Sequence, residues 1–95
     1  LLNLANLLRS GPDAHSPLAG RELVARKVAT LYCMGGAYPS GREWNLQMAP
    51  EAAEHVASSW PTPVVFSGFE IGIAIETGAS LVQAPDTDPQ RKAYE

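Results

Sequence analysis

Clustered basic residues, a cysteine framework and a membrane-length apolar run are all missing from this 95-residue sequence. Its seven lysine and arginine residues are scattered and the formal net charge is −3, so we expect no nucleic-acid partner and no anionic-membrane partner. The single cysteine, Cys33, excludes an intrachain disulfide, and its place in an apolar run predicts a small core residue. No stretch reaches the roughly 18 apolar residues of a membrane span, and no signal-peptide pattern begins the sequence.

Familiar catalytic and cofactor motifs are missing as well. There is no Cys/His spacing of a metal site, no Gly-rich phosphate loop and no Gly-x-Ser-x-Gly turn. His15 lies in a polar segment and His55 on the polar side of a helical pattern, so both are predicted to be solvated. What is present is an ordinary globular composition, 45% hydrophobic and 18% charged, in a chain long enough for one compact unit.

The hydrophobic spacing predicts an α/β chain built around one βαβ unit. Residues 28–34 (VATLYCM) and 64–67 (VVFS) are short apolar runs ended by glycine, which is typical of parallel strands covered on both faces. Between them, residues 50–59 repeat small apolar side chains at helical spacing, with Pro50 in the first turn. We therefore expect a parallel sheet with this helix packed across its two strands.

The flanking segments predict smaller elements. They are a helix over residues 1–8, a loop over 13–20, a helical turn over 21–26, an irregular or briefly helical stretch over 73–81, and a capped helix within 86–95. Helical patterns are already under way at the first residue and still unfinished at the last. We therefore expect a partial domain over residues 1–95, truncated at both ends, and both cytoplasmic and exported locations stay open.

Candidate site residues follow the ends of the two strands, because ligands of parallel sheets bind beyond the carboxyl ends of the strands. After the first strand comes a loop through residues 35–45, which ends in Glu43, Trp44 and Asn45. In an extended segment Glu43 and Asn45 would point to one side and Trp44 to the other. A carboxylate beside an amide suits the vicinal hydroxyls of a sugar. The alternative is a solvated loop with two polar residues around a packed tryptophan.

Glu70 follows the second strand, in the loop predicted over residues 68–72. It would either line the same cleft or cap a neighbouring backbone amide. From residue types and spacing alone, the prediction is an α/β domain with a polar loop at a strand end.

Four segments, in their order and spacing, resemble the inosine-uridine-preferring nucleoside hydrolase family. Residues 2–5 (LNLA) resemble its Leu-Thr-Asn-hydrophobic-Ala helix start, and residues 34–37 (MGGA) its Met-Gly-Gly strand end. Residues 43–45 (EWN), followed by 50–53 (PEAA), resemble its Glu-Phe-Asn and Asp-Pro-Glu-Ala-Ala segments. Residues 67–72 (SGFEIG) are similar to a variant from a bacterial branch.

The resemblance implies a nucleoside hydrolase-like parallel-sheet fold and a parent protein that is a nucleoside N-ribohydrolase, a glycosidase of purine and pyrimidine salvage. In the family, a cluster of Asp residues holds Ca²⁺, which binds the attacking water and the ribose hydroxyls, and an Asp is the general base. This chain carries neither that cluster nor the family's later His/Asp segment, so we expect it to be inactive alone. Its partner would be a small-molecule nucleoside, and a homo-oligomer stays open.

The resemblance also carries roles over by position. Glu43 would bind the 5′ side of ribose, Asn45 its 2′ and 3′ hydroxyls, and Met34 would pack against the sugar. Leu2 falls where the family has a Thr whose backbone carbonyl ligates Ca²⁺, and Glu70 would border the same space. No residue of this chain receives a catalytic role.

The sequence departs from the family in one loop. The loop between the Met-Gly-Gly-like and Glu-Phe-Asn-like segments is shorter than in the family and offers no Asn for ribose, so Ser40 or Arg42 would replace it, or the substrate preference would differ.

The alternative to an enzyme is a non-enzymatic nucleoside hydrolase-like module that binds a carbohydrate or a protein partner. A third alternative is a structural remnant with no site, and base and sugar preference stay open.

Overall fold

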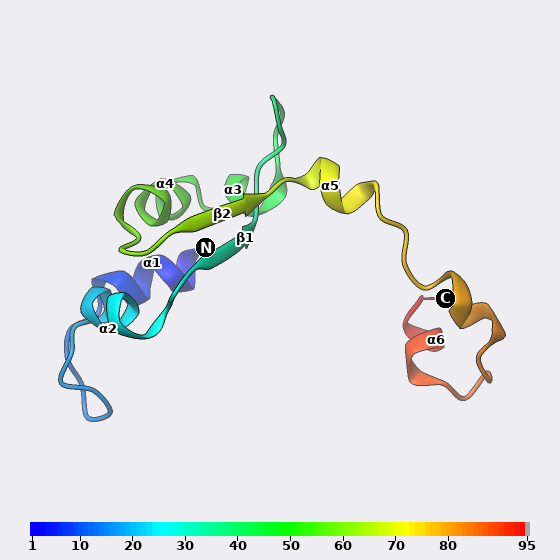
Figure 1. The fold of residues 1–95 in the computed structure, drawn as a ribbon, viewed down its shortest axis with the longest axis horizontal. Coiled ribbons are helices and arrows are strands. Elements are labelled where there is room, and N and C mark those ends of the chain that lie inside the picture. Colours follow the sequence, from blue (N-terminus) through cyan, green and yellow to red (C-terminus); the bar gives the residue numbers. More distant parts are fainter. Residues whose placement is uncertain (95) are drawn as a thin grey trace.

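A computed structural model describes residues 1–94, and its elements follow in the order α1, α2, β1, α3, α4, β2, α5, η1 and α6 (Figure 1). They span Leu2–Arg9, Gly20–Lys27, Leu31–Met34, Trp44–Gln47, Pro50–Ser59, Val64–Ser67, Phe69–Ile73, Ala79–Gln83 and Pro89–Tyr94, where η1 is a 3-10 helix. Strands β1 and β2 pair in parallel, with Leu31 opposite Val64. The predicted α/β class and its βαβ-like unit are confirmed.

Strand β1 is shorter than predicted. The backbone N–H of Val28 donates to the Val24 carbonyl (2.9 Å) and so belongs to the end of α2. The first hydrogen bond of the ladder with β2 is the one that Leu31 N–H donates to the Pro63 carbonyl (2.9 Å). Because proline has no N–H, Pro63 accepts at this position but cannot donate to the ladder. The strand predicted from residue 28 therefore begins at Leu31.

The core of the structure lies among three helices, α1, α2 and α4. The buried side chains that form it are Ala5, Leu8, Val24, Ala52 and Val56, with Leu31 of β1 partly buried against them. The predicted apolar side of α4 is the buried one, but its main partner is α1 (Figure 1). The prediction that α4 packs across the two strands is thus wrong, since α1 occupies most of that side of the helix.

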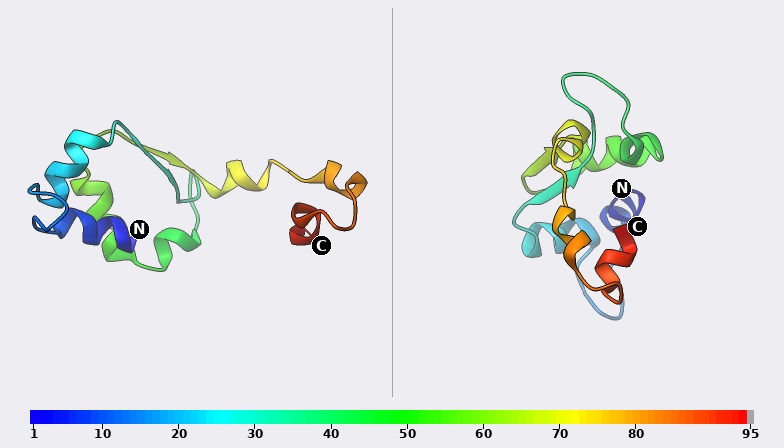
Figure 2. Two further views of the ribbon diagram at one scale, coloured as in Figure 1. Left: turned by 90° about the horizontal axis from the view of Figure 1, so that it is seen from below. Right: turned by 90° about the vertical axis from the view of Figure 1, so that its right-hand side faces the viewer.

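The two strands are covered on one face only. Helices α1 and α4 lie on the same side of the β1–β2 pair, as the left view of Figure 2 shows. On the opposite face Tyr32, Met34 and Val65 are exposed. The prediction of strands covered on both faces is wrong for residues 1–94, because these side chains of the second face remain exposed.

The segment that follows α5, through η1 to α6, stands apart from this body (Figures 1 and 2). The radius of gyration is 17.8 Å, whereas a compact chain of this length would have about 12 Å. None of the described residues in α5, η1 and α6 is buried. Within residues 1–94, no helix combines the length and apolarity needed to cross a membrane.

Two predictions in this segment have different outcomes. Residues 68–72 were expected as loop, but Phe69–Ile73 form helix α5 after Gly68. The predicted cap of the last helix is confirmed, because Asp88 Oδ1 accepts from the N–H groups of Gln90 (2.8 Å) and Arg91 (3.2 Å). Glu95, which ends the predicted range 86–95, lies outside the described residues.

The location of the core leads to a paired prediction. Val56 is 1% exposed and Val82 is 72% exposed. We expect Val56→Ala to lower the free energy of unfolding by about 2 kcal/mol, from lost apolar burial and the cavity left behind. Val82→Ala should change it by less than about 0.5 kcal/mol. Urea unfolding followed by circular dichroism measures both, and equal effects would contradict the placement of the core.

Candidate functional site

A hollow of about 440 Å³ beyond the carboxyl end of β1 brings together three of the four predicted substrate-binding residues. It is lined by Met34, Arg42, Glu43, Trp44, Asn45, Gln47 and Phe69. These residues come from the end of β1, the loop and helix that follow it, and the start of α5. The volume lies in the range of small-molecule sites.

The Glu43 carboxylate is hydrogen-bonded to backbone N–H groups. Its Oε1 accepts from Asn45 N–H (2.8 Å), and its Oε2 accepts from Leu46 N–H (3.1 Å) and Gly36 N–H (3.2 Å). Glu43 is the N-cap of α3 and is only 7% exposed. Asn45 is therefore helical, and the prediction that it shares one face of an extended segment with Glu43 is wrong. The alternative of a solvated loop around a packed Trp44 also fails, because Glu43 is buried and Trp44 is exposed.

These hydrogen bonds also set the charge state of Glu43. The Asn45 N–H is the main cause that lowers the pKa of Glu43 below its ordinary value of 4.5, while burial opposes the shift and the Leu46 and Gly36 N–H groups add to it. The ionised carboxylate is the form that accepts all three bonds. The site thus holds a negative charge whose oxygens already face backbone donors.

Gly36, just after β1, connects this cap to the start of α5. Its N–H donates to Glu43, and its carbonyl accepts from Phe69 N–H at the start of α5 (2.9 Å). Its φ is +84°, and a Cβ here would lie 2.8 Å from the Tyr38 hydroxyl oxygen. A glycine is therefore needed where the chain leaves β1.

Cys33 lies one residue before the end of β1 and is buried. Burial is the main cause that raises the pKa of the Cys33 thiol, and the nearby charge of Glu43 acts in the same direction. A protonated, buried thiol is a poor nucleophile. The prediction that Cys33 is a small core residue is confirmed.

Asn45 and Met34 are held against each other. The Asn45 side-chain Nδ2 donates to the Met34 carbonyl (3.2 Å) and to its Sδ (3.1 Å). Within residues 1–94 no donor bonds to Asn45 Oδ1, so this oxygen can accept from a ligand. Trp44 and Phe69, which are 71% and 48% exposed, add flat apolar surfaces to the hollow.

Sequence reasoning did not find Gln47. Trp44 and Gln47 are three residues apart on α3, a spacing that puts side chains on one side of a helix. The helix itself gave no start signal, because the common N-cap residues are Ser, Thr, Asp and Asn rather than Glu. Recognising α3 would have identified Gln47 as a neighbour of Trp44.

Two predicted residues lie away from this hollow. Glu70 Oε2 accepts from Tyr38 N–H (3.0 Å), which is the backbone-amide alternative considered for it. Leu2 lines a separate hollow of about 240 Å³ together with Arg9 and residues 49–52. As the first residue of α1, Leu2 places its carbonyl in the hydrogen-bond ladder of that helix. The expected convergence of Leu2 and Glu70 on the ribose site is not found.

The donors present do not fit the Ca²⁺ site that the resemblance implies. Ca²⁺ takes six to eight oxygen ligands. Among residues 1–94, no three His, Cys, Asp or Glu side chains gather into a group that could hold a metal ion. The Glu43 carboxylate is occupied by backbone N–H groups, and the Leu2 carbonyl would supply one ligand at most.

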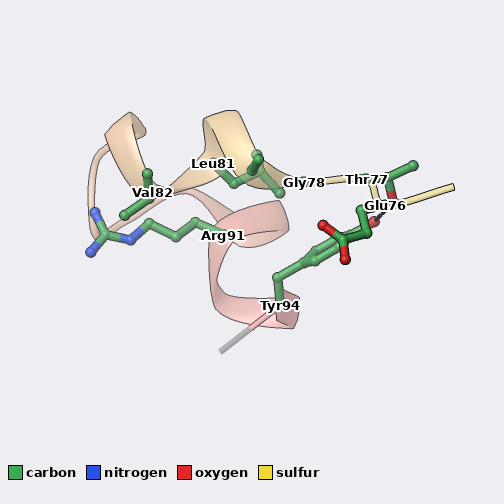
Figure 3. Close-up of a pocket in the computed structure, with 8 residues that line it drawn as sticks. Glu76, Thr77, Gly78, Leu81, Val82, Arg91 and Tyr94 are labelled. Carbon is green, nitrogen blue, oxygen red and sulfur yellow. Dashed lines mark hydrogen bonds between the residues drawn. The ribbon is translucent and has the colours of Figure 1, made fainter. Parts of the chain in front are cut away.

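A larger hollow of about 500 Å³ lies between η1 and α6 (Figure 3). Its lining includes Thr77, Arg91 and Tyr94. The Thr77 and Tyr94 hydroxyls lie 3.0 Å apart, and Arg91 Nη1 contacts Asp86 Oδ1 (2.7 Å) and the Ala84 carbonyl (2.6 Å). These polar groups bond to one another or to the nearby chain, and no predicted site residue lines this hollow. The candidate site is therefore the hollow beyond β1.

Comparisons of the chain with protein-family models, curated proteins and solved structures give no match. Any function assigned to the chain therefore rests on the residues around the hollow and on the resemblance of the four segments.

The lowered pKa of Glu43 leads to a prediction for stability against pH. A carboxyl group with a lower pKa in the folded state contributes stability above its unfolded pKa, and this contribution is lost as pH falls through the folded pKa. We expect Glu43→Gln to lower the urea midpoint at pH 7, with a difference from the native chain that shrinks below about pH 4.5.

The matched control is Glu54→Gln on the exposed side of α4. This substitution should leave the midpoint nearly unchanged at every pH. A Glu43→Gln chain as stable as the native chain at pH 7 would contradict the structural role of this carboxylate.

Proposed function

We propose that this chain forms a ribonucleoside-binding surface of a nucleoside hydrolase-like protein, centred on the hollow beyond β1. One observation carries the proposal. Met34, Glu43 and Asn45, which the resemblance associates with ribose, come from the end of β1 and the start of α3 and border a single hollow. That hollow lies at the end of the strands where parallel sheets bind their ligands.

Asn45 and Met34 would contact the sugar. The two bonds from Asn45 Nδ2 to Met34 fix the amide, which leaves Oδ1 to accept from a ribose hydroxyl. Met34 is partly exposed and offers an apolar surface to the sugar ring. The amide of Gln47, on the same hollow, adds a further donor and acceptor.

Trp44 and Phe69 would contact the base. Trp44 is largely exposed, Phe69 is about half exposed, and both rings line the hollow. Stacking of a base on an aromatic side chain contributes about 1–3 kcal/mol and tolerates different bases. These rings therefore favour a ligand with a planar ring over a simple sugar.

Glu43 is a positioning residue in this proposal rather than the ligand of the ribose 5′ side. Its oxygens accept three backbone N–H bonds, so a sugar hydroxyl would compete with an existing bond. Because one of these bonds comes from the Asn45 N–H, Glu43 fixes the backbone position from which the Asn45 side chain extends. Its contribution to binding is therefore indirect.

We propose binding, and not hydrolysis, for this chain by itself. Cleavage of an N-glycosidic bond requires stabilisation of positive charge on ribose and an activated water. Among residues 1–94, Glu43 brings the only carboxylate to the hollow, and it serves as a helix cap. A parent N-ribohydrolase would supply the remaining carboxylates and Ca²⁺ from other residues, whereas a non-enzymatic binding module would not.

The test is the affinity for inosine and uridine, measured by calorimetry. Asn45→Ala should weaken binding about three- to tenfold, which corresponds to one lost hydrogen bond. His55→Ala, on α4 and outside the hollow, is the control and should not change the affinity. Equal effects of the two substitutions, or release of free base by this chain alone, would contradict the proposal.

A further inference from the structure

Arg42 carries the only positive charge among the residues that line the hollow beyond β1. Within residues 1–94 its guanidinium makes no ion pair and no hydrogen bond. Arg21, by contrast, bonds to the Ser59 carbonyl (2.7 Å), and Arg26 pairs with Glu22 (2.6 Å). The Arg42 donors are therefore unused within the described chain.

Neither Glu43 nor Glu70 forms an ion pair with Arg42 in the described part of the chain. Glu43 is next in sequence, but its oxygens accept from three backbone N–H groups. Glu70, on α5, accepts from Tyr38 N–H. The remaining polar groups of the hollow are the neutral amides of Asn45 and Gln47. The hollow therefore combines one cation, two amides and exposed aromatic rings.

We propose that this hollow takes a ribonucleoside 5′-monophosphate in preference to the uncharged ribonucleoside, with Arg42 as the residue that binds the phosphate. The inference rests on the proposed function and specifies the ligand class of the same site. A guanidinium presents a fork of donors that matches two phosphate oxygens. The 5′-phosphate and the 2′ and 3′ hydroxyls extend from ribose in different directions, which suits a guanidinium and an amide on separate residues.

The preference should come from direct contact rather than from long-range attraction. The net charge of the chain is −3, so its overall field does not draw anions toward it. Because Arg42 is exposed, salt should weaken the contact. We expect adenosine 5′-monophosphate to bind about tenfold more tightly than adenosine at low ionic strength, with a smaller ratio at higher salt.

The experiment measures four probes by calorimetry: adenosine, adenosine 5′-monophosphate, ribose 5-phosphate and inorganic phosphate. Arg42→Gln should bring the affinity for the monophosphate down to that for adenosine. Arg42→Lys should keep part of the preference. Arg9→Gln, which removes the same charge from α1, should leave the preference intact.

Three outcomes would overturn the proposal. Equal affinity of the native chain for adenosine and its monophosphate would refute the phosphate contact while leaving the proposed function standing. Persistence of the preference in Arg42→Gln would refute the assignment to Arg42. Inorganic phosphate or ribose 5-phosphate binding as tightly as the nucleotide would show a plain anion site. Failure of both adenosine and its monophosphate to bind would instead remove the proposed function.

Discussion

The site depends on one buried carboxylate that accepts three backbone N–H bonds. Glu43 joins the turn after β1, through Gly36, to the first turn of α3, through Asn45 and Leu46. Helix α3 has four residues, too few to be stable by itself, so its position depends on contacts such as this cap. With the cap in place, Trp44, Asn45 and Gln47 stand at the edge of the hollow. Without it, the bonds from Asn45 Nδ2 to Met34 would be the remaining described hydrogen bonds between α3 and β1.

The same arrangement divides structural from binding roles among neighbouring residues. The Glu43 carboxylate accepts backbone N–H groups, and the residues before and after it, Arg42 and Asn45, are those to which the proposed function assigns ligand contacts. This explains how a segment that resembles a ribose-binding motif can use its acidic residue internally and present a cation instead. The uncovered face of β1 and β2, with Tyr32 and Val65 exposed, shows that the body offers more apolar surface than its own helices cover.

Strong local signals predicted part of this fold and part of this site. The pattern from Pro50 to Ser59 matches α4 residue for residue, and residues 64–67 match β2, because proline, periodicity and glycine mark their limits. Helices α3 and α5 were expected as loops, since a glutamate cap and the glycine inside Phe69–Ile73 are weak helix signals. The direction of the Glu43 carboxylate could not be predicted, because it depends on Gly36, seven residues earlier in the chain. Met34, Glu43 and Asn45 do lie together at the carboxyl end of β1, as the sequence predicted.

Amide hydrogen exchange followed by NMR tests the central role of Glu43 most directly. The account predicts that the N–H groups of Gly36, Asn45 and Leu46 are protected together in the native chain. In Glu43→Gln these three should lose protection, while the amide of Val56 in the helical core keeps it. Fast exchange of the three amides in the native chain, or unchanged protection in the variant, would contradict the account.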